Sequence, residues 1–355
     1  MKYNTKNLRT GFLYFYIHFV TEVICFFVLG KYFESPPLMW FIYLTYDMLA
    51  FVPQAVIGYI NDKFPKFSFA AVGLVLLAAA LILQNTVSLP ILSLTVLCLG
   101  NAFVHVNGAE VTLQTSDGSL SHSSIFVAGG SFGVISGKLL SKTDIPFWLL
   151  LVLIASAIPF VILAQMYLND KSLNSRKPCE SFKYCNNKIS TSLVIILAVL
   201  VVSIRGFMAY GIPTSWNKTT LQTVLLFVFM GAGKALGGIL SDLFGIKKVA
   251  LLSVLIALPL LMFGDNTMLV SLIGVMFFSM TMSVSLGILV SALPSAPGLA
   301  FGLTTIGLFL GAAPVFFFKI KSIALNCAML SLLTVICLIC LYFSIGKDVD
   351  NEQTV

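Results

Sequence analysis

Twelve long apolar segments constrain the fold of this 355-residue chain more than any other feature of its sequence. Each has about 20 residues, the length that an α-helix needs to cross the hydrocarbon core of a bilayer. Charged residues make up 10% of the chain, whereas a soluble domain carries about 25%. The segments lie at roughly 11–33, 36–60, 67–86, 89–114, 120–141, 146–168, 191–213, 218–242, 248–264, 267–292, 298–318 and 323–345. We therefore expect an all-α integral membrane protein with twelve transmembrane helices.

One long polar and basic connection lies at the midpoint of the chain, and the other connections are short. It predicts two six-helix pseudo-repeats around a central cavity. The expected parts are an N-terminal bundle over 11–168, a cytoplasmic linker over 169–190, a C-terminal bundle over 191–345 and a cytoplasmic tail over 346–355.

The lysines and arginines set the orientation. With the N-terminus in the cytoplasm, thirteen of them fall on the cytoplasmic side and five on the outer side. This excess follows the positive-inside rule and predicts that both termini are cytoplasmic. We expect the protein in the bacterial cytoplasmic (inner) membrane. Membrane topology also accounts for the net charge of +7, so no nucleic-acid partner is predicted.

A short pattern occurs once in each half, at an offset of 180 residues. In both copies an apolar run closes with a glycine, then an acid, then basic residues. The members are Gly58, Asp62, Lys63 and Lys66 in the first half and Gly238, Asp242, Lys247 and Lys248 in the second. Internal repeats in a polytopic membrane chain are typical of secondary transporters. An acid at a helix C-terminus opposes the helix dipole, so each should have a basic partner or the N-terminus of a neighbouring helix.

Glycine pairs four residues apart also recur in both halves. Gly133 and Gly137 lie in the fifth segment, and Gly307 and Gly311 lie in the eleventh. Small residues at this spacing let helices approach closely. Static packing alone would explain the pattern, and we expect that these glycines also pack helices of the two halves against each other.

Ionisable side chains inside the apolar segments are the candidate functional residues. Placing one in a bilayer costs about 2.5 kcal/mol or more, so they should face a cavity or one another. They are His18, Glu22, Asp47, His105, Glu110, Lys138, Arg205 and Lys234.

The first helix carries a polar strip. Tyr14, His18, Glu22 and Cys25 follow at spacings of four, four and three, which places them on one helix face. An imidazole and a carboxylate one turn apart can share a proton, as a proton-coupling site requires. A structural pair that fixes this helix against its neighbours would show the same pattern.

The fourth helix is polar on two opposite faces. His105 lies on one face, together with Asn101, and Asn107 and Glu110 lie on the other. Only one face can line a cavity, and the other should bond to a neighbouring helix, with Asp47 as a candidate partner. The sequence leaves open which face does which.

The second half contributes cations. Arg205 and Lys234 either pair with the acids of the first half or hold an anionic group of a substrate. The sequence does not distinguish these roles.

Twelve helices in two sixes, a central linker and the repeated glycine–acid–base motif resemble the major facilitator superfamily along essentially the whole chain. The resemblance implies alternating access, a central cavity lined by helices 1, 4, 7 and 10, and a cytoplasmic latch built on Asp62 and Asp242. Lys63 stands where the family usually has arginine and Pro65 where it has glycine. The first latch should therefore be the weaker one, because lysine lacks the bidentate fork of arginine.

Motifs of other function classes are missing from the sequence. It has no His-Glu-x-x-His and no phosphate-binding Gly-x4-Gly-Lys-Ser/Thr, so we predict no catalytic residue, no cofactor and no enzyme. The predicted function is secondary transport of a small polar, charged solute coupled to protons, by a monomer in the lipid bilayer. The alternative is a divalent transition-metal ion transporter using His, Cys, Met and Glu ligands, whose metal site the sequence does not define.

Overall fold

The computed structural model describes residues 8–33, 39–64, 67–87, 89–174, 178–212, 214–317 and 322–346. In these ranges twelve helices are long and apolar enough to cross a membrane, which confirms the predicted number. Lys66 and residues 347–355 lie outside the described ranges. The elements are α1 (Arg9–Val28), η2 (Leu29–Phe33), α2 (Met39–Phe51), α3 (Gln54–Lys63), α4 (Phe69–Ile82), η3 (Leu83–Val87), α5 (Pro90–Gln114), α6 (Ser121–Leu140), α7 (Phe147–Asn174), η4 (Pro178–Ser181), α8 (Thr191–Gly211), α9 (Thr220–Phe244), α10 (Ile246–Phe263), α11 (Met268–Ser279), α12 (Thr281–Ala292), α13 (Pro297–Ala312), η5 (Ala313–Phe316) and α14 (Ile323–Ser344).

Local signals set several of the helix ends. Ser190 and Ser322 cap α8 and α14 by accepting a hydrogen bond from a backbone N–H of the first turn. Thr219 and Gln222 form a reciprocal capping box at the start of α9. Gly245 ends α9 with φ of 90°, a conformation that favours glycine, and allows α10 to begin at the next residue.

Two of the predicted membrane helices are broken in the middle. The second is divided into α2 and α3 at Pro53, which has no backbone N–H to continue the helix. The tenth is divided into α11 and α12 at Met280. The second span, Met39–Lys63, and the tenth span, Met268–Ala292, therefore each consist of two helices.

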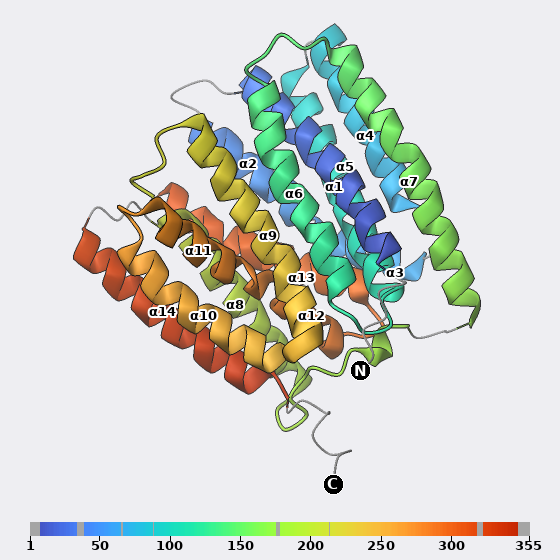
Figure 1. Ribbon diagram of the computed structural model, residues 1–355. Coiled ribbons are helices and arrows are strands. Elements are labelled where there is room, and N and C mark those ends of the chain that lie inside the picture. Colours follow the sequence, from blue (N-terminus) through green and yellow to red (C-terminus); the bar gives the residue numbers. More distant parts are fainter. Residues whose placement is uncertain are drawn as a thin grey trace.

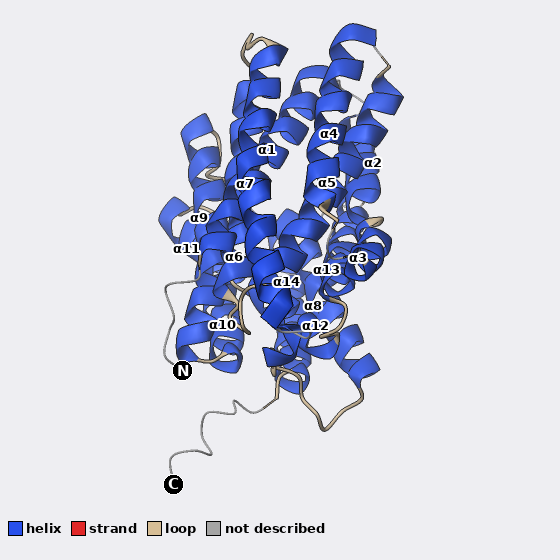
Figure 2. Ribbon diagram, turned by 90° about the vertical axis from the view of Figure 1, so that its right-hand side faces the viewer, coloured by secondary structure: helices blue, strands red, loops and turns tan. Residues whose placement is uncertain are grey.

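Helices α1–α7 gather on one side of the molecule and α8–α14 on the other (Figure 1). Nearly all helices run along the long direction of the bundle (Figure 2). Large apolar side chains such as Ile91 and Phe263 are exposed on the outside, whereas polar ones such as Glu22 and Asn101 are buried. This distribution suits a protein surrounded by lipid.

The predicted glycine contacts between the halves are wrong for Gly133, Gly137, Gly307 and Gly311. A methyl group at either of the first two would collide with the backbone of α1, which belongs to the same half. At Gly307 or Gly311 it would crowd the backbone of α8, again within one half. Glycines four residues apart do allow close helix packing here, but their spacing carries no information about which neighbouring helix is packed.

Other glycines bring the two halves together. Gly58 on α3 lies against the carbonyl group of Gly298 on α13, and Gly302 lies against the backbone of Ala55. Gly238 on α9 lies against Ser124 on α6. These contacts surround the end of the bundle that contains Asp62 and Asp242. We call this end the latch end.

Gly58→Ala is expected to loosen the latch end, because the added methyl group meets backbone rather than a movable side chain. Overpacking of this kind costs about 1–3 kcal/mol. Spin labels at the exposed residues Phe64 and Phe244, one in each half, should show a larger population of long distances. The matched control is Val56→Ala, an exposed position on the same helix. An unchanged distance distribution in Gly58→Ala would contradict the prediction.

Candidate functional site

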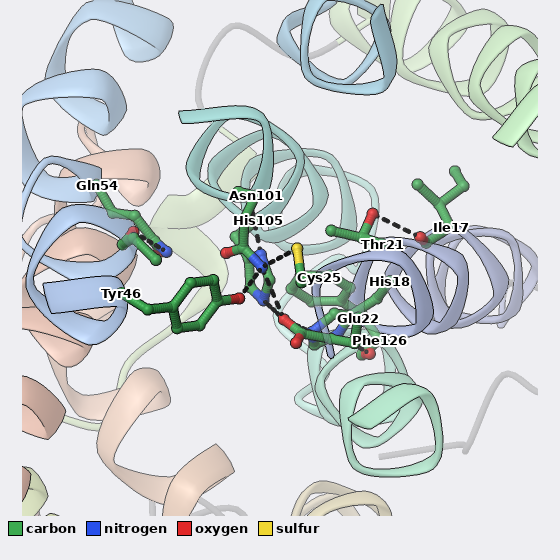
Figure 3. Close-up of polar contacts among 11 residues, drawn as sticks. Ile17, His18, Thr21, Glu22, Cys25, Tyr46, Gln54, Asn101, His105 and Phe126 are labelled. Atoms are coloured by element: carbon green, nitrogen blue, oxygen red, sulfur yellow. Dashed lines mark hydrogen bonds and ion pairs between the residues drawn. The ribbon is translucent and has the colours of Figure 1, made fainter. Parts of the chain in front are cut away.

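Three side chains meet in the interior of the first half. His18 and Glu22 come from α1, and His105 comes from α5 (Figure 3). The Nε2 atoms of His18 and His105 lie 3.8 Å and 3.3 Å from Oε1 of Glu22. All three side chains are buried. We call these three residues the His–Glu–His cluster.

The hydrogen bonds of the two imidazoles fix where their protons are. Nδ1 of His18 lies 2.9 Å from the carbonyl oxygen of Phe126, and Nδ1 of His105 lies 2.9 Å from that of Asn101. A carbonyl oxygen can only accept, so each Nδ1 carries a hydrogen and donates it. In the neutral ring Nε2 is then an acceptor, and it faces a carboxylate oxygen, which is also an acceptor. These atoms attract each other only when at least one further proton or another cation lies in the cluster.

Asn101 connects the cluster to the second helix. Its Nδ2 donates to Oε1 of Glu22 at 2.9 Å and lies 3.1 Å from the hydroxyl oxygen of Tyr46 on α2. It also contacts Sγ of Cys25, one turn further along α1, at 3.4 Å. The sequence placed Asn101 on the same helix face as His105 but gave no sign of Tyr46.

An aromatic residue of the second half covers the cluster. The ring of Phe301 on α13 lies 6.4 Å from the ring of His105 and 6.1 Å from that of Phe126, between ring centroids. Phe301 is almost fully buried. A relative movement of the halves at this point would therefore change the surroundings of His105.

The structure shows what each of the two polar faces of the fourth membrane helix, α5, contacts. Asn101 and His105 belong to the face that meets Glu22. On the other face, Asn107 accepts a hydrogen bond of 3.0 Å from the Tyr14 hydroxyl, and Glu110 accepts one from Asn61 on α3. Asp47 is therefore not the partner that the structure gives to this face. Asp47 instead interacts electrostatically with Glu22 and with Lys138 of α6.

The cations of the second half lie on α8 and α9. Arg205 is buried, and its Nη1 donates to the thioether sulfur of Met282 at 3.0 Å. Lys234 interacts electrostatically with Arg205 and with Glu22 of the first half. In the part of the chain that the structure describes, neither forms an ion pair within 4.0 Å.

The repeated acids bind helix N-termini. Asp62 accepts hydrogen bonds of 2.7 Å and 2.9 Å from the backbone N–H groups of Gly298 and Leu299, at the start of α13. Asp242 accepts 2.8 Å and 2.9 Å bonds from those of Leu120 and Ser121, at the start of α6. Each acid thus joins the two halves, and the helix dipole there favours a negative charge.

The basic residues of the motif have other contacts. The ammonium group of Lys63 lies 4.2 Å from the ring centre of Tyr59. Lys247 lies 4.4 Å from that of Tyr342, and Lys248 is exposed. The sequence allowed either a basic residue or a helix N-terminus as the partner of each acid. The structure shows a helix N-terminus in both cases.

The linker contributes contacts that the sequence did not indicate. The backbone N–H of Tyr184 donates to Oγ of Ser291 on α12 at 2.8 Å, and its hydroxyl donates to the carbonyl of Gly118, before α6, at 2.7 Å. Its backbone carbonyl accepts from Gly346 at 2.9 Å. Burial raises the pKa of the Cys179 thiol, which also belongs to the linker, to about 12, so the thiol keeps its proton.

Comparisons with known proteins give the same fold throughout. The chain matches the fucose:proton symporter FucP of E. coli with a TM-score of 0.65 and 14% identity, over 97% of this chain and 99% of that one. It matches the human organic anion transporter MFSD10 (TETRAN) with a TM-score of 0.61 and 12% identity, over 96% and 100%. The chain also matches a second structure of FucP, described as a major facilitator superfamily transporter in the outward conformation. This match has a TM-score of 0.56 and 13% identity, over 94% of this chain and 98% of that one.

One curated protein is similar in sequence. The fosmidomycin resistance protein of Escherichia coli (strain K12) is 27% identical over 246 residues, which are 61% of this chain and 59% of that protein. The match thus spans less than two thirds of that relative. No protein-family model matches the chain. At 14% and 12% identity, the likeness to the symporter and to the anion transporter shows a shared fold.

Proposed function

This chain has the major facilitator superfamily fold, and we propose that it is a secondary active transporter of a small polar, charged solute, coupled to protons. The observation that carries the proposal is the His–Glu–His cluster, whose acceptor atoms converge and need a proton among them. The twelve helices make it an integral membrane protein. We place it in the bacterial inner membrane as a monomer, with the latch end and both termini in the cytoplasm.

In the proposed mechanism, residues 11–168 and 191–345 are the two bodies that move, joined by the linker 169–190. The contacts of Asp62 and Asp242 hold the latch end closed. Phe301 then covers His105, so the cluster is shielded from that side. Opening of the latch end withdraws α13 and exposes the cluster, and the proton held there leaves to the cytoplasm.

Charged groups from several helices surround Glu22. His18 lies on the same helix and His105 on α5, while Asp47 of α2 and Lys234 of α9 interact with it electrostatically. Loss of the proton leaves a negative charge on Glu22 that Lys234 can attract. Because Lys234 belongs to the other half, protonation of the cluster is coupled to the force between the halves.

The direct test is transport by proteoliposomes that contain a pH-sensitive dye. Fosmidomycin and fucose, which the names of two of the similar proteins mention, are offered together with phenylphosphonate, benzoate and benzylammonium, with and without an imposed pH gradient. We expect at least one charged solute to be accumulated against its concentration, with proton movement that a protonophore abolishes. If the accumulation of every solute were the same with and without the pH gradient, proton coupling would be disproved.

Divalent-metal transport is the second candidate function, and one observation favours it. The ligand atoms of His18, Glu22 and His105 all lie within 4.8 Å of one another, close enough to hold a metal ion. A soft-to-borderline divalent ion such as Zn²⁺ or Co²⁺ suits imidazole and carboxylate ligands. Thermal stability measured with Mn²⁺, Fe²⁺, Co²⁺ and Zn²⁺ tests this function, and unchanged stability with all four would exclude it.

Phe301→Ala is expected to uncouple transport, because it removes the ring that covers His105. The same proteoliposomes should leak protons without solute, at a rate several times that of the wild type. Phe301→Leu should leak less, since leucine keeps most of the buried volume. Leu310→Ala, a change at an exposed residue of the same helix, is the control. A proton leak equal to that of the wild type in Phe301→Ala would show that this ring is not part of the barrier.

A further inference from the structure

The membrane interior of the second half carries positive charge without an acid of its own. Between residues 191 and 345 the only acidic residues are Asp242 and Asp265. Asp242 is held by the start of α6, and Asp265 accepts hydrogen bonds from Ser215. Arg205 and Lys234 therefore have no carboxylate partner within their own half.

Among the described residues, no acid of the first half lies within 4.0 Å of a charged nitrogen of these cations. Glu22 already faces His18 and His105 and accepts a hydrogen bond from Asn101. Asp47 interacts with Lys138. An unneutralised charge inside a membrane is costly, so an anion bound between these two neighbouring cations would stabilise both of them.

Arg205 has hydrogen-bonding capacity to spare. Only 7% of its surface is exposed, and its Nε is buried without a hydrogen-bond partner in the described part of the chain. Within the described ranges its side chain donates one hydrogen bond, to the sulfur of Met282, a weak acceptor. A buried guanidinium normally has several strong acceptors, and an oxyanion would supply two at once.

Lys234 lies on the part of α9 that packs against the first half. It lies three residues after Gly231 and four before Gly238, and both glycines contact α6 of the first half. The helical spacing places Lys234 close to this face. The break at Met280 brings consecutive residues to both cations, since Met282 contacts Arg205 and Ser283 donates to the backbone carbonyl of Lys234.

One side of Arg205 borders a void that is too small for a ligand. The void that Arg205 lines with Phe278, Thr281 and Cys337 measures about 10 Å³, room for one water molecule at most. An oxyanion does not fit there. An oxyanion bound by Arg205 would therefore lie on its other side, toward Lys234.

We propose that Lys234 and Arg205 form the binding site for an oxyanion group, carboxylate or phosphonate, of the transported solute. That the bound solute is also transported rests on the proposed function. The binding of the anion itself does not depend on proton coupling. The bound anion would complete the charge balance between the two cations and Glu22. Solutes with an anionic group would be accepted, and their cationic analogues rejected.

Equilibrium binding to the purified full chain tests the site without any gradient. Benzoate, phenylphosphonate, benzyl alcohol and benzylammonium share an aromatic body and differ in the polar group, so isothermal titration isolates the effect of charge. We expect the two anions to bind more tightly than the alcohol, and benzylammonium not to bind. Lys234→Gln and Arg205→Gln should each weaken anion binding about tenfold or more, as expected for loss of a charged hydrogen bond worth about 1.5–3 kcal/mol.

Arg205→Lys keeps the charge but loses the fork, so it should lie between the wild type and Arg205→Gln. Lys218→Gln removes an exposed cation from the same half and is the matched control. Equal anion affinity in all variants, or preference for benzylammonium, would overturn the proposal. Anion binding without proton-driven transport would keep this site and remove the proposed coupling, whereas proton-driven transport of neutral solutes alone would do the reverse.

Discussion

Glu22→Gln is expected to abolish transport driven by a pH gradient. Glu22 is the one carboxylate that both imidazoles of the cluster face, at 3.3 Å and 3.8 Å. The amide keeps the shape of the side chain but cannot take up a proton, so the cluster loses its acid. In proteoliposomes, accumulation of the transported solute should fall to the leak level, and solute-dependent proton movement should disappear.

Solute binding at equilibrium should survive this change, since the proposed oxyanion site lies on Arg205 and Lys234. The ratio of binding to driven flux therefore separates a coupling defect from misfolding. Glu180→Gln, at an exposed glutamate of the linker, is the control and should leave both unchanged. If Glu22→Gln retained full gradient-driven accumulation, the proton would have to be carried elsewhere.

Much of the architecture could be predicted because a membrane span is a matter of length and composition. The twelve apolar segments correspond to the twelve candidate spans. The breaks at Pro53 and Met280 were not predicted. Proline removes one backbone donor and sometimes interrupts a helix, but Pro159 and Pro259 lie inside uninterrupted helices. Whether a proline breaks a helix depends on its neighbours in space.

Sequence spacing identified which residues of the site share a helix face but not what they face. The strip of His18 and Glu22 was found from its period, and its meeting with His105 required the fold. Asn61, Tyr46 and Phe301 were missed, because an amide or an aromatic ring at a helix position has no distinctive pattern. The same limit explains the glycine pairs, whose neighbour proved to lie in the same half.

The latch residues allow a sharper test, because the two repeats differ in their hydrogen bonds. Asp62 accepts two backbone hydrogen bonds at the start of α13. Asp242 accepts two backbone bonds and also the hydroxyls of Ser119 and Ser121 at the start of α6. Asp242 should therefore contribute more to closure of the latch end than Asp62 does.

Asp242→Asn is accordingly expected to open the latch end. The amide has one acceptor oxygen and no charge, so it loses charge-assisted bonds worth about 1.5–3 kcal/mol each and the attraction of the helix dipole, worth about 0.3–1 kcal/mol. A net change of about 1.4–2.8 kcal/mol would shift the ratio of closed to open forms about ten- to hundredfold. Spin labels at Phe64 and Phe244, with the partly exposed Cys185 and Cys327 replaced by serine, measure that ratio. Asp62→Asn should shift it less.

The matched control for this experiment is Asp265→Asn. Asp265 also accepts a backbone N–H and a serine hydroxyl, at 2.7 Å and 2.9 Å, but both come from Ser215 of its own half. The chemistry removed is the same, while the contact between the halves is left intact, so the label distances should not change. Equal shifts in Asp265→Asn and Asp242→Asn would mean that the labels report general destabilisation. No shift in Asp242→Asn would mean that the close helix packing around Gly58 and Gly238 keeps the latch end closed without the carboxylate.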